Sequence, residues 1–336
     1  MLSRTPFFRL PRLAKGAGGP TDKFTLVAME NVTMSNGRSL GETLRNHAQW
    51  LEGVETAFRG ILEAETLNGL EWPGLNLRSI IMRGTALLDA DLSGADLSDA
   101  ILDGVNFERA ILSGADLCGT QISDTYFVQG WMPGSMWAET KLRGSSFQKA
   151  NLQNARFQNA LLESCKLMGA VLAEVSFHHA RFATSDFTDS DLTKAQFIRA
   201  QLQSCRLVAV KGAGANFSNA RLKGCNCAKA QFTGAKFYQA DLGGSEFDRV
   251  VLHDADLREA QLGGVDFCQS DLSYARFRGA KLFATDFRGA DLTGAQELTV
   301  AQLIQARTDQ RTILPNGTRG PYSRFSGAER SALISR

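Results

Sequence analysis

The sequence predicts an all-β solenoid, a rod of short coils that stack and share one core. Leucine, phenylalanine or another bulky residue recurs at nearly every fifth position from Leu77 to Leu292, without an insertion or deletion. A small residue stands two positions before each bulky one, as Ala90 does in the segment ADLSG. A period of five residues fits neither an α-helix nor a β-strand, whose periods are about 3.6 and about 2 residues. Repetition of so short a unit instead indicates stacked coils, none of which is stable alone.

A second, longer period appears when the bulky positions are sorted in steps of 20 residues. The column from Leu87 to Phe287 and the column from Leu77 to Phe277 hold most of the aromatic residues of the array. The two columns between them are almost entirely leucine. This alternation has a period of ten residues, and four walls per coil are the simplest closed arrangement that accounts for it.

The repeat unit, a small residue, a polar residue, Leu or Phe and two further polar residues, resembles the A(D/N)LXX unit of the pentapeptide repeat family. The resemblance covers residues 75–296. It implies a right-handed, quadrilateral β-helix with four pentapeptides in each coil. At about 4.8 Å per coil, residues 75–296 then form about 11 coils and a rod roughly 50 Å long.

Residues 21–74 are predicted to cap the start of the rod, because an open solenoid leaves unpaired coil edges that recruit other chains. Residues 24–34 are rich in strand-forming side chains and predict a strand. Ser39, followed three residues later by Glu42, forms a capping box, which predicts that a helix begins there.

An apolar stripe with steps of four and three residues follows the capping box through residues 40–61 and predicts a helix that ends near Gly69. Two interpretations of this stripe remain open. It lies across the first coil as a cap, or it pairs with a second copy of the chain as a short coiled coil. A dimer through residues 40–61, or through an end of the rod, therefore remains a hypothesis. His47 lies in the stripe and is interpreted as a packed residue rather than a ligand.

The other end of the array is also predicted to carry a helix, over residues 297–315, with Thr299 as its N-cap. This resembles the helical cap common in the family. Residues 1–20 are predicted to be a disordered basic tail, and residues 316–336 a basic tail that frays. We expect a cytoplasmic protein. Residues 1–20 contain four cations and no acid, so a targeting or secretion signal remains the alternative to a disordered tail. No apolar run reaches about 18 residues, so no membrane span is expected.

Charge is small over the whole chain but uneven along it. The net charge is +2, so no strong field recruits nucleic acid, which is not an expected partner. Acids outnumber bases by 9 to 3 over residues 75–139, bases outnumber acids by 14 to 5 over residues 140–236, and acids lead again by 10 to 6 over residues 237–296. The middle of the rod is therefore predicted to be a basic belt. The candidate residues of this belt are Lys141, Arg143, Lys149, Arg156, Arg181, Arg199, Arg206, Arg221, Lys223 and Lys236.

No residue pattern predicts catalysis, a metal or a cofactor. The aspartates that precede bulky residues, such as Asp91 and Asp96, are explained by the repeat itself. Cys165, Cys205 and Cys225 occupy the small position of the unit and are predicted to be buried thiols, because a zinc site needs further ligands at a different spacing. We therefore expect a protein that is not an enzyme.

Two places depart from the repeat while they keep its phase. Gly212 replaces a bulky residue and is predicted to bend the rod. In the other, several apolar side chains are predicted to point outward from one coil and form a partner patch. The alternative is that the coil bulges at its proline and tucks the Trp131 side chain against a neighbour. The candidate patch comprises Tyr126, Val128, Trp131, Pro133 and Met136.

Three functional hypotheses follow from these features. The favoured one is a non-enzymatic scaffold that binds an unidentified protein through the patch, the basic belt or a terminal helix. A second is implied by resemblance to the quinolone-resistance members of the family, which mimic DNA and bind the topoisomerase gyrase. The array over residues 75–296 has 24 acids and 23 bases, whereas a mimic should reproduce the negative field of DNA. The third is a secreted bacterial effector or a rod that binds an anionic ligand.

Overall fold

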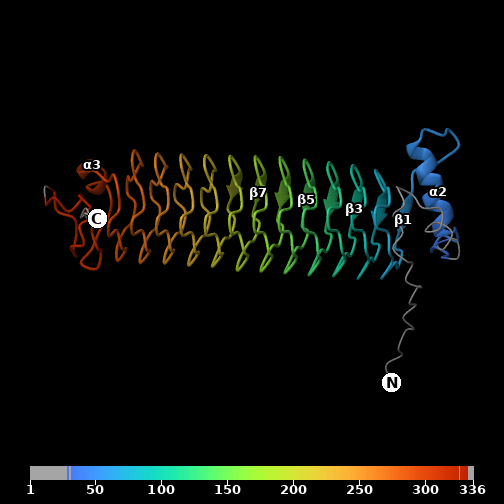
Figure 1. Cartoon of the computed structure of the whole chain (residues 1–336), viewed down its shortest axis with the longest axis horizontal. Coiled ribbons are helices and arrows are strands. Elements are labelled where there is room, and N and C mark those ends of the chain that lie inside the picture. The colour runs from blue at the N-terminus through green and yellow to red at the C-terminus, as the bar shows by residue number, and fades with distance from the viewer. Residues whose placement is uncertain (1–28, 30–31, 325, 332–336) are drawn as a thin grey trace, which may run out of the picture.

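The computed structural model describes residues 29, 32–324 and 326–331. The predicted tail over residues 1–20 and most of the predicted strand over residues 24–34 lie outside these ranges. The described chain is a long rod with a helix at each end (Figure 1). One sheet of eight parallel three-residue strands runs along it in chain order. The strands are β1 (Ile61–Glu63), β2 (Ile81–Arg83), β3 (Ile101–Asp103), β4 (Gln121–Ser123), β5 (Lys141–Arg143), β6 (Leu161–Glu163), β7 (Arg181–Ala183) and β8 (Gln201–Gln203).

Each coil contains 20 residues, which confirms four pentapeptides per turn. Ile61 pairs with Ile81, and Ile81 with Ile101, in the same register. Isolated bridges between residues 20 apart connect the remaining pentapeptides and continue as far as the pair Arg276 and Gln296. The regular strands span about seven turns rather than the 11 predicted coils, because from β8 onward single bridges replace the strands in the same register.

The four sides of the coil are named here by their bulky central residues. The strand wall carries β1–β8 and is centred on Leu62 and every twentieth residue after it. The second, third and fourth walls are centred in the same way on Leu67, Trp72 and Leu77. Because the coil has four sides, the third wall lies opposite the strand wall. One pentapeptide of one wall is a rung, and residues 20 apart lie on adjacent rungs.

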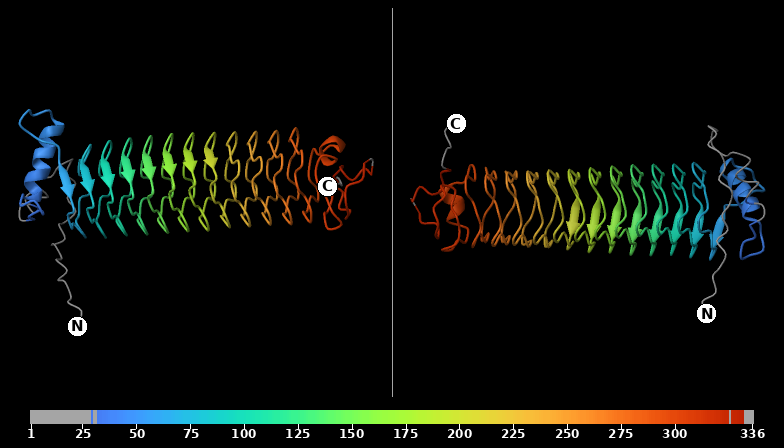
Figure 2. Two further views of the ribbon diagram at one scale, coloured as in Figure 1. Left: turned by 180° about the vertical axis from the view of Figure 1, so that it is seen from behind. Right: turned by 60° about the horizontal axis from the view of Figure 1, so that its bottom comes forward.

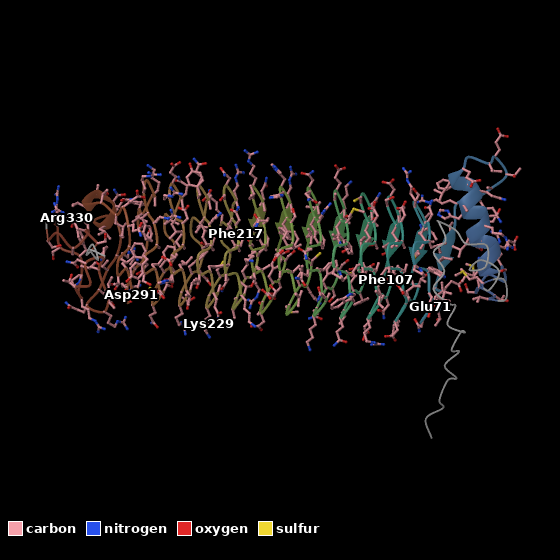
Figure 3. All side chains as sticks on the ribbon, viewed as in Figure 1. Glu71, Phe107, Phe217, Lys229, Asp291 and Arg330 are labelled. Atoms are coloured by element: carbon pink, nitrogen blue, oxygen red, sulfur yellow. The ribbon has the colours of Figure 1, made fainter. Side chains whose placement is uncertain are left out.

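Aromatic rings stack along the axis and fill the core. On the second wall the Phe127 ring lies 5.2 Å from that of Phe107 and 4.8 Å from that of Phe147. Across the axis it meets the fourth-wall ring of Trp137 edge to face, at 5.3 Å and 83°. Such pairs add about 0.5–1.5 kcal/mol to the benefit of burial. The predicted aromatic columns therefore lie on the second and fourth walls, as Phe107 and Phe217 do inside the outline of the rod (Figure 3).

Gly212, at a bulky position of the third wall, is explained by its neighbour on the next rung. A Cβ atom added to Gly212 would lie 2.5 Å from the Phe232 ring, so that ring already fills the volume a side chain would need. The register continues through this rung, from Asp191 to Lys211 to Gln231. The glycine therefore makes room for Phe232.

Aspartate and asparagine hold the turns of the rod. The Asp91 Oδ1 atom accepts a 2.9 Å hydrogen bond from the backbone N–H of Ser93, and Asp96 accepts the equivalent bond from Ser98. Asn106 does the same with Glu108. These side-chain bonds mimic a backbone turn, which is why Asp or Asn so often precedes the bulky residue.

The helix at the start of the rod is α2 (Leu40–Leu51), capped by Ser39. It is shorter than the predicted helix. The chain leaves it at Gly53, whose φ is +83°, and has already entered β1 at Ile61. The coils therefore begin near residue 60 rather than at residue 75, because the end of the predicted stripe pairs as a strand. Leu40 and Leu44 are buried within the chain, where α2 covers the end of the rod in both views of Figure 2.

The C-terminal helix α3 (Val300–Leu303) is one short turn that closes the other end. Thr299 and Gln302 form its capping box, and the Gln302 side chain donates to the carbonyl oxygens of Phe277 and Ala280 at 2.9 and 3.0 Å. The basic tail beyond residue 315, which was predicted to fray, is partly folded. Its Thr318 carbonyl accepts a 2.8 Å bond from the N–H of Leu314, because Gly317 turns the chain back. No helix in the described residues has the length and hydropathy that a bilayer span needs.

Candidate functional site

The strand wall differs from the other three walls in the residue that immediately precedes each bulky one, which points outward. Asp or Asn occupies this outward position five times on each of the other walls and once, at Asp241, on the strand wall. Between β1 and β8 the strand wall has none, and its outward residues are instead isoleucine on the first three rungs and then a mixture of glutamine, leucine and basic residues. These residues are Ile61, Ile81, Ile101, Gln121, Lys141, Leu161, Arg181 and Gln201.

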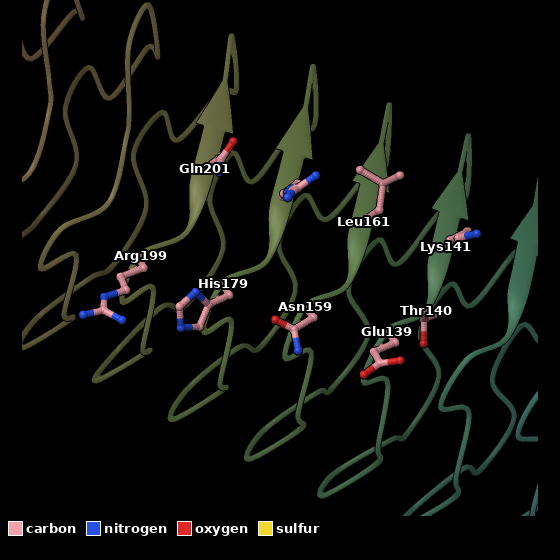
Figure 4. A pocket seen from close by; sticks show the side chains of 9 residues that line it. Glu139, Thr140, Lys141, Asn159, Leu161, His179, Arg199 and Gln201 are labelled. Carbon is pink, nitrogen blue, oxygen red and sulfur yellow. The ribbon is translucent and has the colours of Figure 1, made fainter.

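A hollow of about 510 Å³ lies where the fourth wall turns into the strand wall (Figure 4). Two parallel rows of side chains line it, each with one residue per rung. The corner row is Glu139, Asn159, His179 and Arg199, and the strand row is Lys141, Leu161, Arg181 and Gln201, with Thr140 between them. We call this the basic hollow.

Cations dominate the basic hollow. Lys141, Arg181 and Arg199 are exposed, and none of the three forms an ion pair with any carboxylate of the residues that the structure describes. Glu139 is the single carboxylate of the lining, at the end of the corner row. Thr140 is buried and its hydroxyl donates to the Leu117 carbonyl oxygen at 2.9 Å, so it belongs to the wall.

A second hollow of about 350 Å³ continues along the strand wall toward the start of the rod, and Lys141 lines both. Its lining includes Ile101 and the carboxylate of Asp103, which accepts a 2.6 Å bond from the Ser123 hydroxyl. At the far end of the same wall Phe283 is 73% exposed, beyond the side-chain-free positions Gly243 and Gly263. The residues that precede the bulky positions of the strand wall are thus apolar over β1–β3 and basic on β5 and β7, and a single exposed phenylalanine stands at the far end.

Family models identify the repeat. A model described as a pentapeptide repeat region matches residues 180–257, and a model described as pentapeptide repeats in eight copies matches residues 90–129, 138–169 and 260–296. Together these ranges cover more than half of the 336 residues. The chain belongs to the pentapeptide repeat family.

Several solved structures are similar to this pentapeptide repeat protein. HetL of the cyanobacterium Nostoc sp. strain PCC 7120, involved in the regulation of heterocyst differentiation, is 22% identical, with a TM-score of 0.37 over 83% of this chain and 98% of HetL. Full-length QnrB1, a plasmid-mediated fluoroquinolone resistance protein, is 18% identical, with a TM-score of 0.22 over 74% of this chain and 94% of QnrB1. Rfr23 of the cyanobacterium Cyanothece 51142 is 22% identical, with a TM-score of 0.24 over 37% and 85% of the two chains. No curated protein sequence matches the chain.

The candidate patch of this pentapeptide repeat protein is not one surface. Tyr126 and Trp131 are 51% and 52% exposed, but they stand on the second and third walls, and Met136 stands on the fourth. Val128 and Pro133 are half-buried at the corners between these walls. The alternative is also wrong, because Trp131 keeps its rung between Ile111 and Asn151 and its ring stays exposed.

The basic belt is likewise distributed over several walls. Two lysines of the belt, Lys211 on the third wall and Lys194 at the corner of that wall, were not singled out from the sequence. Of the belt residues, Arg206 on the second wall pairs with Asp186 at 3.4 Å, and Lys223 pairs with Asp241 at 3.1 Å. Arg156 and Lys236 lie on the fourth wall, and Lys141, Arg143, Arg181, Arg221 and Lys223 lie on the strand wall, with Arg199 at its corner.

Six of the nine residues that line the basic hollow were not among the predicted site residues, namely Glu139, Thr140, Asn159, Leu161, His179 and Gln201. The signal that finds them is the 20-residue period, because His179 follows Glu139 by two coils in the corner row and Leu161 follows Lys141 by one coil in the strand row. Burial lowers the pKa of the neighbouring His178, with a further contribution from the adjacent His179.

The buried cysteines belong to the coil. The Cys225 Sγ atom lies 3.3 Å from the Leu202 carbonyl oxygen, the same position that the Ser185 hydroxyl takes 3.2 Å from the Leu162 carbonyl. Burial raises the pKa of the Cys165 thiol to about 12, so this thiol stays protonated at neutral pH. Within the described part of the chain, no group of three or more His, Cys, Asp or Glu residues is placed to hold a metal ion.

Proposed function

We propose that this pentapeptide repeat protein is a non-enzymatic scaffold that binds a partner protein along its strand wall. The observation that supports this most is the difference between the walls. The strand wall alone lacks the Asp and Asn turn residues over eight rungs, and both hollows lie on it. Exposed apolar residues lie at its two ends, with Ile61 at 42% and Phe283 at 73% exposure.

The backbone holds this wall in a fixed geometry. The Lys141 N–H donates to the Thr120 carbonyl oxygen, and the Leu161 N–H to the Thr140 carbonyl oxygen, both at 2.9 Å. Each rung is therefore tied to the next, and side chains on the wall repeat at about 4.8 Å. A rigid surface loses little conformational entropy when a partner binds, which favours affinity.

A pair of variants on opposite walls tests the proposal. Ile61→Ser with Phe283→Ser removes the exposed apolar ends of the strand wall, and Ile111→Ser with Trp131→Ser removes comparable side chains from the third wall. The partner is recovered from the native host with the tagged chain, purified, and titrated against each variant. We expect the strand-wall variant to lose affinity by at least about tenfold. Loss in the third-wall variant with none in the strand-wall variant would show that the partner uses a different face.

The acidic start of the array favours a second candidate, the gyrase-binding DNA mimic. Residues 75–139 hold 9 acids against 3 bases. Some of these carboxylates are already paired, since Asp89 binds Arg109 at 2.7 Å and Asp99 lies 3.4 Å from Arg78. Purified chain that slows supercoiling by DNA gyrase would support this candidate, and an unchanged supercoiling rate would remove it.

A further inference from the structure

We propose that the basic hollow binds an acidic segment of the partner protein in an extended conformation. This inference rests on the proposed scaffold function and specifies the chemistry of what the strand wall recognises. Lys141 on β5 and Arg181 on β7 line the basic hollow from the strand row, and Arg199 lines it from the corner row. Figure 4 labels Lys141 and Arg199 in these two rows. The three cations face the same open hollow of about 510 Å³.

Elsewhere on the rod, arginines form ion pairs with carboxylates of the same rung, and Lys141, Arg181 and Arg199 form no such pair within the described residues. Arg258 binds Asp256 at 2.7 Å and Arg288 binds Asp286 at 2.7 Å, in each case through the carboxylate of the same rung. Around Arg181, by contrast, the neighbours in the strand row are Leu161 and Gln201, which carry no charge. An anionic ligand would supply the counter-charge that the wall itself does not provide.

The spacing of the cations suits an extended polypeptide. Lys141, Arg181 and, one rung beyond the lining of the basic hollow, Arg221 occupy every second rung of the strand wall, so their backbones repeat at about 10 Å. A segment in the extended polyproline II conformation advances about 3.1 Å per residue and returns every third side chain to the same side, so every third residue of such a peptide meets one of these rungs. A segment of about six or seven residues spans the distance from Lys141 to Arg221, roughly 19 Å.

Acidic residues lie at both ends of the basic stretch, and within it the strand wall carries one carboxylate, Glu163 on β6. Asp103 and Asp124 precede it along the strand wall and its corner, and Asp241 follows Arg221 on the next rung. A long polyanion would meet these carboxylates, whereas a short segment ends before them. A nucleic acid would also gain from aromatic side chains on which bases stack, and the lining of the basic hollow holds no Phe, Tyr or Trp. These features favour a short acidic peptide over a nucleic acid.

The experiment uses the full chain and a fluorescein-labelled hexaglutamate peptide, with hexaglutamine as the uncharged peptide. Arg181→Glu with Arg199→Glu reverses two charges in the basic hollow. Lys194→Glu with Lys211→Glu makes the same charge change on the third wall and its corner, where both lysines are exposed. All four residues are on the surface, so circular dichroism should show the same fold for both variants.

We expect hexaglutamate to bind the unmodified chain with an affinity that falls as salt is raised, and hexaglutamine not to bind. The hollow variant, Arg181→Glu with Arg199→Glu, should lose at least about tenfold in affinity for hexaglutamate. The lysine variant, Lys194→Glu with Lys211→Glu, should stay within about twofold of the unmodified chain. Equal loss in both variants, no loss in either, or no binding of hexaglutamate would overturn the proposal. So would a single-stranded oligonucleotide that binds more tightly than the peptide and is lost in the hollow variant.

The two proposals can fail separately. If the Ile61→Ser and Phe283→Ser variant releases the partner while the hollow variant keeps it and hexaglutamate does not bind, only the acidic-segment proposal is wrong. If hexaglutamate binds the basic hollow but the partner is lost only in the Ile111→Ser and Trp131→Ser variant, the hollow is a binding site and the scaffold uses another wall.

Discussion

At the scale of single residues, each pentapeptide imposes a backbone demand at its last turn position, two residues after the bulky one. Gly264 takes a φ of +67° there, and Asp99 and Asn154 take +57° and +60°. This left-handed region is open to glycine and costs other residues free energy, least for Asp and Asn. The preceding residue of the same turn is outside that region, so adjacent positions have opposite requirements.

The neighbouring glycines Gly263 and Gly264 test this demand directly. We expect Gly264→Ala to destabilise the rod by about 1 kcal/mol, because its φ of +67° strains an alanine even though no atom lies within 4 Å of the new Cβ. Gly263→Ala should instead stabilise by about 0.4–1 kcal/mol, since its φ is ordinary, its Cβ would lie 3.6 Å from the Phe283 carbonyl oxygen, and alanine restricts the unfolded chain. Urea unfolding of both variants measures the difference. Shifts of the same sign would contradict the argument.

The sequence could predict which residues point inward or outward, but the predicted patch shows the limit of that information. Tyr126, Trp131 and Met136 all precede bulky residues, and all three point outward as the repeat requires. Each is five residues from the next, and five residues carry the chain around one corner to the next wall. Closeness in sequence therefore separates them in space, while Trp131 gains Ile111, 20 residues away, as its neighbour.

At the scale of the elements, the sequence predicted the strands' period and the start of α2 but not its end. Val54, Phe58 and Ile61 continue the spacing of a helix stripe, yet Val54 and Phe58 are 42% and 38% exposed, and Ile61 pairs with Ile81 in the sheet. Apolar spacing alone does not separate the last turn of a helix from the first residue of a strand. The backbone pairing of Ile61 with Ile81 is what makes this segment a strand, and the spacing of apolar residues along the sequence carries no information about that pairing.

His47 makes the attachment of α2 sensitive to pH. Its side chain is buried, and Nδ1 accepts a 3.1 Å hydrogen bond from the Gly60 N–H at the start of the first coil. Burial lowers the pKa of His47 below its ordinary 6.5 by more than the backbone of Arg78 raises it, and the Arg59 guanidinium lowers it further. The unfolded segment therefore takes up a proton more readily than the folded one, so the stability of α2 is full above about pH 6.5 and falls as the pH drops below it.

Hydrogen exchange of the α2 amides, corrected for intrinsic rates, measures this effect. We expect protection to stay constant above about pH 6.5 and to fall between about pH 6.5 and about pH 5.5 in the unmodified chain. His47→Gln keeps a side-chain oxygen that can accept the Gly60 N–H but does not titrate, so its protection should change little over that range. The same fall in His47→Gln would assign the pH dependence to another group.

At the scale of the whole molecule, the 20-residue period was visible in the sequence, and it is enough to place side chains in rows. It predicted the aromatic columns of the core, as the stack of Phe197, Phe217 and Phe237 at 4.7 and 5.0 Å confirms. It did not predict the hollows. Their depth depends on how far the side chains of two adjacent rows, such as Arg199 and Lys141, extend from the corner, which composition and spacing do not specify.

We expect the two end caps to keep the rod from growing by addition of further coils. The backbone of β1 pairs with β2 on one side, and α2 covers the end beyond it. Ser35 also ties the capping segment to the first coil, through bonds of 3.0 and 3.1 Å from its N–H to the Glu65 carboxylate. An uncovered strand edge would offer its free N–H and C=O groups to another chain.

Detaching the cap should therefore make the protein self-associate. Leu40→Asp with Leu44→Asp places two charges where the side chains are 0% and 4% exposed, so α2 cannot keep its buried position at tolerable cost. Sedimentation velocity over a range of concentrations should then show reversible dimers or longer rods, while Gln49→Asp, on the exposed side of α2, stays as the unmodified chain. A double variant that remains the size of the unmodified chain at every concentration, with α2 amides unprotected, would show that the first coil protects its own edge and that α2 serves another purpose.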